Sequence, residues 1–322
     1  MKFIGLDIME LSTMDFDKKN FKQNDVKQKS FSIKDFKTKA DSDSMIVRNH
    51  KLSDGSVVPL LHFKKLDEVD FIKHCFTTRM GGCSTGIFES MNLSFTRGDD
   101  EEAVLNNYRR LAEAMDADAC DFVTSDQTHT TNVIRVGKAQ KGIGVTRPRP
   151  YTDVDGLVTN EPGVILSTFY ADCVPLYFVD PVHRAIGLSH SGWRGTVNRM
   201  GRMTLEVMNR EFGTEPADVI AAIGPSICQD CYEISEDVAQ HFISEFGTTD
   251  DPNAQEILFA KGGGKYQLNL WECNRRIMVE AGIPNENISV TNVCTCCNPD
   301  KLFSHRASHG RRGNLGAFMC LK

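Results

Sequence analysis

The chain lacks both a long apolar run and an excess of positive charge. No stretch approaches the roughly 18 consecutive apolar residues that a membrane-spanning helix needs. The formal net charge is −6 over 322 residues, whereas nucleic-acid binding requires a basic face for phosphate contacts. Asp7 and Glu10 interrupt the apolar residues at the start of the chain, which therefore does not resemble a secretory signal. We expect a cytoplasmic protein with no membrane span and no nucleic-acid partner.

Two common catalytic motifs are also missing. There is no Gly-x-Ser-x-Gly elbow, and the glycines at 262–264 are not followed by the Lys-Ser or Lys-Thr of a phosphate-binding loop. The eleven cysteines are odd in number and scattered along the chain. Without a secretory signal, this pattern predicts free thiols in a reducing compartment and no structural disulfide.

The N-terminal region differs in composition from the rest of the chain. Residues 15–44 contain no glycine or proline, and they alternate charged and polar residues with isolated phenylalanines such as Phe31 and Phe36. So few apolar residues cannot bury a core. We predict a mobile polar extension over residues 1–45 and a catalytic domain over 46–322. Alternatively, the extension folds on contact with a protein partner.

The remaining sequence alternates between strand and helix patterns. Periodicity and turn residues predict a single α/β (α+β) layered domain, with mixed β-sheets flanked by helices. The expected strands are 57–63, 71–77, 133–136, 154–158, 164–169, 176–179, 185–188, 219–223 and 288–293, and the expected helices are 99–115, 198–212, 235–246 and 270–281.

Three residues form a candidate metal site: His129, Cys173 and His190. A thiolate and two imidazoles suit zinc, and three protein ligands leave a fourth position open, as in catalytic sites. Strand, turn and strand patterns connect Cys173 to His190, and such a hairpin brings both residues to one edge of a sheet. Each residue has an ordinary structural explanation by itself, but their combination with the run from Gly192 to Gly195 indicates a site.

Two arginines beside glycines are candidates for binding an anion. Arg194 lies between Gly192 and Gly195, and Arg79 precedes Gly81, with Asn92 as a further polar candidate. The planar guanidinium matches the geometry of phosphate or carboxylate. For Arg79 alone, a hairpin turn with a solvated arginine is the simpler explanation.

A rival metal site involves the other cysteines. Cys228 and Cys231 form a Cys-x-x-Cys pair, and two of Cys294, Cys296 and Cys297 would complete a set of four thiolates. The irregular spacing and the lack of accompanying glycines argue against a structural zinc site here.

Five motifs occur in the same order as in a known family. They are Thr78 to Gly82, Gln127 to His129, Ala171 to Pro175, His190 to Gly195, and Cys294 to Arg306. With them the chain resembles the polyphenol-oxidase-like, or laccase-domain, family. The resemblance implies a fold related to that of some cysteine hydrolases and a metal triad at His129, Cys173 and His190. The ligand types and cellular availability favour zinc over copper as its metal. The expected catalytic residues are Cys173, His190, Arg79 and Arg194, and the expected substrate contacts are Arg79, Asn92, Gln127 and Asp172.

The same resemblance implies an activity. It is purine nucleoside phosphorolysis of adenosine, inosine, guanosine or S-methyl-5′-thioadenosine, with phosphate as co-substrate, together with adenosine deamination. Multicopper oxidation needs many imidazoles in His-x-His pairs, whereas the chain has nine histidines and no such pair. A polyphenol oxidase is therefore a weaker alternative. Two others are a cysteine amidohydrolase of peptidoglycan precursors, with Cys173 as nucleophile and His190 as base, and a non-catalytic regulator that retains the pocket for binding.

Overall fold

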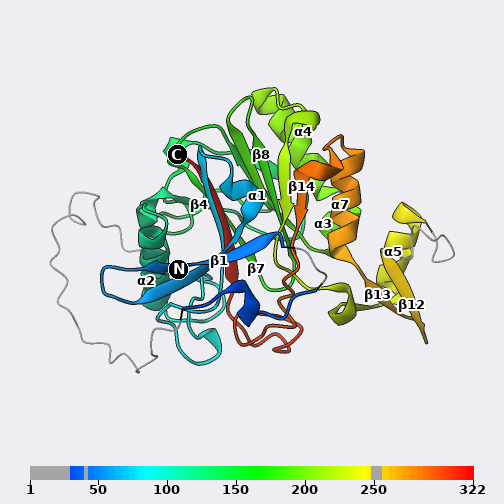
Figure 1. The fold of residues 1–322 in the computed structure, drawn as a ribbon, viewed down its shortest axis with the longest axis horizontal. Coiled ribbons are helices and arrows are strands. Elements are labelled where there is room, and N and C mark those ends of the chain that lie inside the picture. The colour runs from blue at the N-terminus through cyan, green and yellow to red at the C-terminus, as the bar shows by residue number, and fades with distance from the viewer. Residues whose placement is uncertain (1–29, 40–42, 248–255) are drawn as a thin grey trace.

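Two mixed β-sheets form the centre of the computed structural model, which describes residues 30–39, 43–247 and 256–322. Within these residues the first sheet has the strand order β1-β2-β3-β15-β7-β4, and the second has β14-β10-β8-β9-β6-β5. A smaller sheet, β11-β13-β12, lies to one side with α5 (Figure 1). The strands of the first sheet are β1 Met45–Lys51, β2 Val57–Phe63, β3 Ile72–Thr77, β4 Phe122–Thr124, β7 Ile165–Tyr170 and β15 Leu315–Leu321. Those of the second are β5 Val133–Arg135, β6 Gly156–Thr159, β8 Val174–Asp180, β9 Ala185–Ser191, β10 Ile220–Ile223 and β14 Ile288–Val290, and those of the third are β11 Glu233–Ser235, β12 Leu258–Gly262 and β13 Lys265–Leu268.

Both large sheets combine parallel and antiparallel pairs. β8 and β9 are antiparallel, as are β15 and β3. β4 pairs in parallel with β7, β5 with β6, and β10 with β14. The predicted fold class, a layered domain with mixed sheets flanked by helices, is confirmed.

The helices that cover the sheets begin and end where local chemistry favours it. The Asp100 side chain accepts a hydrogen bond from the Ala103 amide and caps α2, whose first turn carries two glutamates. Gly213, with φ 77°, ends α4 in a left-handed conformation that glycine adopts without strain. None of the helices in the described part of the chain is long and apolar enough to cross a membrane. The helices are α1 Lys64–Asp67, α2 Glu101–Ala114, α3 Trp193–Val197, α4 Met200–Phe212, α5 Glu236–Phe246 and α7 Leu270–Glu280.

The apolar core has three parts. One lies between the large sheets, where Leu166 of β7 and Met319 of β15 belong to the same cluster as Leu188 of β9. The second lies between the first sheet and α2, and the third between the second sheet and the helices α4 and α7. Figure 1 shows α2 on one side of the sheets and α4 and α7 on the other. Each fully buried large apolar side chain contributes about 1.5–3 kcal/mol, so these contacts hold the sheet edges that carry the site.

The C-terminal strand β15 was not predicted, yet it lies between β3 and β7 in the first sheet. Every one of its residues, Leu315–Leu321, is buried. A strand that is buried on both faces lacks the alternation of polar and apolar residues by which a strand is recognised. Its position depends on pairing with strands at residues 72–77 and 165–170, far away in the sequence.

Residues 30–39 lie against the body of the fold. Phe36, which the composition placed outside the core, is only 6% exposed and belongs to the central apolar cluster. Thr38 forms a β-bridge with Val293, and the Lys39 amide donates to the Asn292 carbonyl at 2.7 Å. The packed chain therefore extends N-terminally of Met45. Most of the predicted extension, residues 1–29, lies outside the described residues, and the boundary near residue 45 stays a prediction.

Candidate metal centre

His129, Cys173 and His190, here called the triad, lie together at one end of the second sheet. Cys173 immediately precedes β8, and His190 lies in β9 opposite Pro175 in the antiparallel register. His129 is on the loop that follows β4. The ligand atoms of the three side chains lie within 4.8 Å of one another, and Cys173 Sγ is 3.9 Å from His129 Nε2. The predicted hairpin thus brings Cys173 to His190, and the β4 loop adds the third residue.

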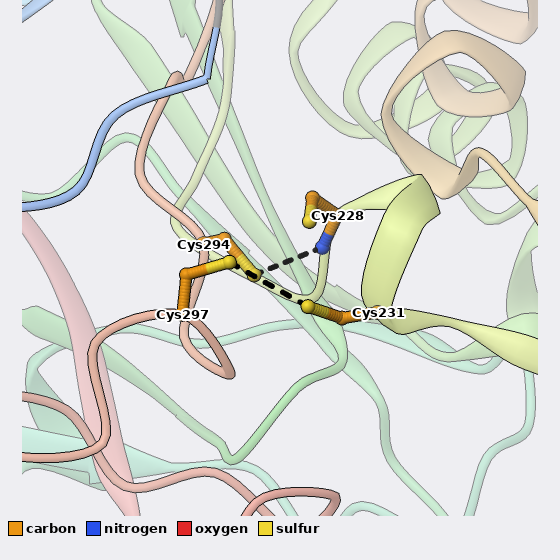
Figure 2. Close-up of side chains that lie close together, drawn as sticks. All are labelled: Cys228, Cys231, Cys294 and Cys297. Atoms are coloured by element: carbon orange, nitrogen blue, oxygen red, sulfur yellow. Dashed lines mark hydrogen bonds between the residues drawn. The ribbon is translucent and has the colours of Figure 1, made fainter.

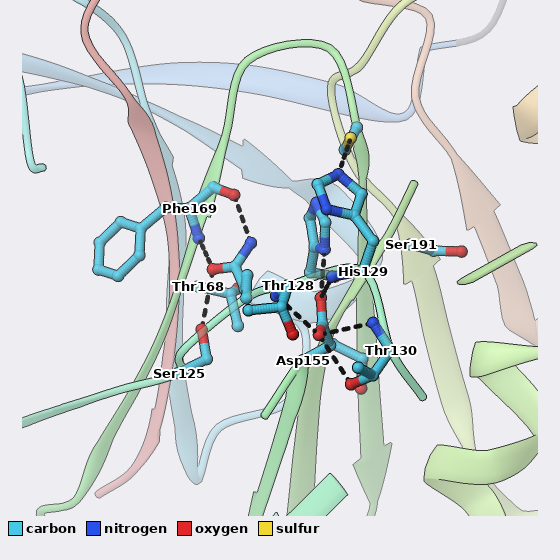
Figure 3. A network of polar contacts seen from close by, with 12 residues as sticks. Ser125, Thr128, His129, Thr130, Asp155, Thr168, Phe169 and Ser191 are labelled. Atoms are coloured by element: carbon cyan, nitrogen blue, oxygen red, sulfur yellow. Dashed lines mark hydrogen bonds and ion pairs between the residues drawn. The ribbon is translucent and has the colours of Figure 1, made fainter. Parts of the chain in front are cut away.

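The buried carboxylate of Asp155 organises the triad. One oxygen lies 2.8 Å from His190 Nδ1. The carboxylate also accepts the backbone amides of Thr128, His129 and Thr130 at 3.1, 3.1 and 2.9 Å (Figure 3). Because Nδ1 of His190 is engaged, its Nε2 is the nitrogen left to bind a metal. Sequence reasoning missed Asp155. The feature that could have indicated it is an acidic residue directly before the glycine that begins β6.

The backbone around the triad adopts conformations that need support. His129 has φ 68° and Asp172 has φ 92°, both in the left-handed region that costs of order 1–3 kcal/mol for a residue other than glycine. Gly192 leaves no room for a side chain: a Cβ there would lie 2.8 Å from His129 Cδ2 and 3.1 Å from Cys173 Sγ. The triad is therefore closely packed against the backbone on one side, while His129 is exposed on the other.

Electrostatics favour the thiolate form of Cys173. Burial opposes ionisation, but the charge of His190 and the hydrogen bond from His129 outweigh it and lower the pKa of Cys173 to about 6. Burial likewise disfavours the charged form of His190, whereas Cys173 and Asp155 raise the pKa of His190 to about 9. A thiolate is the form of cysteine that binds metals and attacks electrophiles.

These donors fit a zinc ion held by three protein ligands. The set combines one sulfur with two imidazole nitrogens, and Asp155 fixes the orientation of His190 in the way that supporting carboxylates orient zinc-bound histidines. Exposure of His129 leaves a side from which water or substrate can approach.

Two of the predicted substrate contacts hold strands and loops together. Gln127 donates to the Phe169 carbonyl at 2.7 Å and accepts the Phe169 amide at 2.6 Å. Asn92 is fully buried, donates to the Ser94 carbonyl and Asp99, and accepts the Asn314 amide. None of these hydrogen bonds reaches the triad, so both side chains position the surrounding chain.

Asp172 and Arg79 are also engaged with other segments. Asp172 directly precedes Cys173. Its carboxylate accepts hydrogen bonds from the Thr295 hydroxyl at 2.6 Å and from the Arg306 amide at 2.7 Å. Arg79 donates from Nε to the Glu89 carbonyl and from Nη1 to the Pro299 carbonyl, and its guanidinium lies 4.6 Å from the Phe303 ring centroid. These contacts brace the C-terminal loops around the site and do not join Arg79 to the triad.

Two other arginines have guanidinium nitrogens without a hydrogen-bond partner among the described residues. Arg194 is exposed and lies over the Trp193 ring at 4.3 Å. Arg312 is half-buried. Its Nη1 donates to the Gly313 carbonyl and to Asn314 Oδ1, whereas its buried Nε has no hydrogen-bond partner among the described residues. Burial and Arg97 lower the pKa of Arg312 to about 10, while Asp172 and Cys173 act in the opposite direction. Arg312 is therefore within electrostatic reach of the triad. In the sequence, the feature that could have indicated it is its position next to Gly313.

A family model described as multi-copper polyphenol oxidoreductase laccase matches residues 73–322. This match includes every residue of the triad and the Asp155 carboxylate.

Proteins of similar sequence align with most of the chain. A purine nucleoside phosphorylase, YlmD of Bacillus subtilis, is 36% identical over 248 residues, covering 77% of this chain and 87% of that protein. A purine nucleoside phosphorylase of Bacteroides thetaiotaomicron is 37% identical over 257 residues, covering 80% and 94%. The adenosine deaminase RL5 of an unknown prokaryotic organism is 32% identical over 251 residues, covering 77% and 94%.

A solved structure shares the fold. The hypothetical protein YfiH of Bacillus licheniformis superposes with a TM-score of 0.76 at 34% identity, covering 82% of this chain and 96% of that one.

Proposed function

The chain belongs to the multi-copper polyphenol oxidoreductase laccase family, and from this membership we propose that it is a zinc-dependent purine nucleoside phosphorylase that also deaminates adenosine. The names of its relatives support an enzyme that processes nucleosides. The observation that carries the proposal is the triad with Asp155 behind it, which combines a metal-binding donor set with an exposed side.

Both reactions are displacements at a purine nucleoside. In phosphorolysis a phosphate oxygen bonds to the ribose C1′ while the bond from C1′ to the purine nitrogen breaks. In deamination the oxygen of water replaces the amino group at C6, and ammonia leaves. Each reaction needs an activated polar group and an environment that accepts developing negative charge.

The triad supplies the means to activate a polar group. His129, Cys173 and His190 would hold zinc, which provides Lewis-acid chemistry for water or for a polar atom of the substrate. Asp155 keeps the imidazole of His190 in one orientation, and through three backbone amides it fixes the loop that carries His129.

Arginines supply the environment that accepts negative charge. Arg312, whose Nη1 is bonded within the chain but whose Nε has no partner, and the exposed Arg194 are the proposed contacts of phosphate. A guanidinium binds phosphate through a planar pair of donors. Arg79 has two of its nitrogens bonded to backbone carbonyls, so it would contribute through Nη2 alone. Asn92, Gln127 and Asp172 would act through the loops that they hold in place.

Product analysis tests the proposal. The purified full chain is given adenosine or inosine, with and without inorganic phosphate, before and after metal removal. We expect phosphate-dependent release of free base and conversion of adenosine to inosine, both lost on chelation and restored by zinc. No release of base from a zinc-loaded protein at any phosphate concentration would refute it.

The phosphate contact is tested separately by Arg312→Gln. Loss of a hydrogen bond to a charged group costs about 1.5–3 kcal/mol, which corresponds to about a 10- to 100-fold rise in the KM for phosphate. The matched control is Arg311→Gln, which removes the same charge from the neighbouring exposed residue. An equal effect of both substitutions would reduce the role of Arg312 to general surface charge.

One observation favours a second function, that of a cysteine amidohydrolase. Asp155, His190 and Cys173 form a chain in which the carboxylate orients the imidazole and the imidazole adjoins the sulfur, as in nucleophilic cysteine sites. For such an enzyme, chelation would spare or raise hydrolysis of a peptidoglycan-precursor amide, and Cys173→Ser would abolish it. Amidase turnover that survives Cys173→Ser would exclude the nucleophile.

A further inference from the structure

Four cysteines outside the triad converge on one point. Cys228 and Cys231 lie at the short 3-10 helix Gln229–Cys231, and Cys294 and Cys297 lie on the loop that follows β14. All four sulfur atoms are within 4.8 Å of one another, and Cys231 Sγ is 3.5 Å from Cys297 Sγ. Figure 2 shows the four side chains directed toward a common centre, and none of them is in a disulfide. We call this group the cysteine cluster.

The spacing of these cysteines is regular when the correct pair is chosen. Cys228 and Cys231 form one Cys-x-x-Cys pair, and Cys294 and Cys297 form a second one, which leaves Cys296 as an additional thiol. With Cys294 and Cys297 as the second pair, the spacing does not argue against a zinc site. Two such pairs are a common arrangement for structural zinc.

The geometry of the cluster fits a tetrahedral ion. A zinc–sulfur bond is about 2.3 Å long, so a tetrahedral site separates its sulfur atoms by about 3.8 Å. The sulfur atoms of Cys231 and Cys297 are 3.5 Å apart, and no two sulfur atoms of the cluster are more than 4.8 Å apart. These separations lie on both sides of the tetrahedral value. In addition, the Cys228 amide donates to Cys294 Sγ at 3.2 Å, a contact that stabilises a thiolate.

One cation lies close to such a site, and its charge is shared with Asp230. Four thiolates around a divalent cation carry a net negative charge, which needs a nearby cation when partly buried. The Lys39 ammonium lies within electrostatic reach of Cys228 and Cys297 and is held by an ion pair with Asp230 at 2.8 Å. This lysine belongs to the N-terminal segment that packs on the loop of Cys294 and Cys297.

The cluster joins segments that are distant in the sequence. Asn298, next to Cys297, accepts the Lys37 amide at 2.7 Å and donates to the Cys294 carbonyl at 2.8 Å. Thr295, between the two cysteines, donates to Asp172 at 2.6 Å, and Asp172 directly precedes Cys173 of the triad. A metal ion bound at the cluster would fix the N-terminal segment, the loop at 228–231 and, through Thr295 and Asp172, the chain next to Cys173.

We propose that Cys228, Cys231, Cys294 and Cys297 bind a structural zinc ion, separate from the metal of the triad. All four ligands come from the protein, so the site is closed and has no position for substrate. The ion would hold together loops separated by more than sixty residues of chain. This inference does not depend on the nucleoside activity.

Metal analysis of the full chain with an altered triad tests the proposal without any change to the cluster. The double variant His129→Ala/Cys173→Ala removes two ligands of the triad. We expect it to retain about one zinc per chain and, after replacement by cobalt, to show the sulfur-to-cobalt charge-transfer absorption of a site with four thiolates. Absence of bound metal in this variant would overturn the proposal, and so would iron in place of zinc.

Cysteine variants complete the test. Cys228→Ser/Cys231→Ser should lose about one zinc per chain relative to the unaltered protein, whereas Cys296→Ser, from the same loop, should lose none. If the first variant does not fold, thiol labelling of the unaltered chain replaces it: zinc should protect the four cysteines, and chelation should expose them. Labelling at equal rates with and without zinc, or a disulfide between Cys231 and Cys297 in the freshly purified protein, would contradict the site.

Discussion

The triad and the cysteine cluster present two kinds of donor set in one chain. In the triad a single sulfur is combined with two imidazoles, one of them exposed, and a buried carboxylate stands behind it. In the cluster four sulfurs face one another, with a backbone amide and a lysine as support. The surroundings of a cysteine, more than its own chemistry, therefore decide its role. An open side permits reaction, whereas a closed shell of ligands permits only structural support.

His190→Ala should have the largest effect on turnover. It removes a triad ligand whose metal is worth several kcal/mol of transition-state stabilisation, so turnover of adenosine and inosine should fall by about 1000-fold. Circular dichroism should show a folded protein, and thermal melting should show a lower midpoint, because the buried Asp155 loses its partner. Cys120→Ser, at an exposed cysteine that belongs to neither the triad nor the cysteine cluster, is the control. Retained turnover would separate the activity from the triad.

Gly192→Ala tests whether the closed backbone side of the triad matters. The new Cβ would lie 2.8 Å from His129 and 3.1 Å from Cys173 Sγ, so both ligands must shift. Displacement of reacting groups by about 1 Å can cost about 100-fold in rate. The matched control is Gly195→Ala in α3, where the nearest atom is 3.5 Å from the added Cβ. Steady-state kinetics should separate the two variants, and equal losses would argue against a specific steric effect at the triad.

Asp155→Asn should reduce turnover by about 10- to 100-fold, as expected when a supporting residue of a metal ligand is lost. The amide cannot accept from His190 and from three backbone amides as the carboxylate does. Metal content at limiting zinc should fall together with activity. Asp153→Asn is the nearby control, because Asp153 is exposed and accepts the Thr128 hydroxyl without contacting His190. Full zinc occupancy with unchanged turnover in Asp155→Asn would limit Asp155 to a role in folding.

The smallest effect on turnover, but the largest on stability, is expected for Cys228→Ser/Cys231→Ser. Loss of a structural zinc worth several kcal/mol should lower the thermal midpoint by about 10 °C. The rate at low temperature should change least of the four cases, because the cluster contacts the triad only indirectly, through residues such as Thr295 and Arg306 that bond to Asp172. Calorimetry with and without chelator measures the shift. Loss of turnover with an unchanged midpoint would reverse the comparison and give the cluster a catalytic role.

By itself the sequence determined most of the local structure and the identity of the triad. The predicted helix at 198–212 and the strand at 57–63 correspond to α4 and β2, because capping glycines and apolar periodicity act within a few residues. Cys173 and His190 were placed together because only a tight hairpin separates them. His129 was found through its motif and not through any local geometry.

Only the tertiary structure decided which distant groups meet. It placed β15 between β3 and β7, buried Phe36, and brought Asp155 against His190. It also engaged Asn92 and Gln127 in contacts that hold the chain, and it joined two Cys-x-x-Cys pairs into one cluster. The physical reason is common to all of these cases. Each contact depends on two segments far apart in the sequence that become neighbours only when the sheets pair and the core is buried, and no periodicity within either segment records its partner.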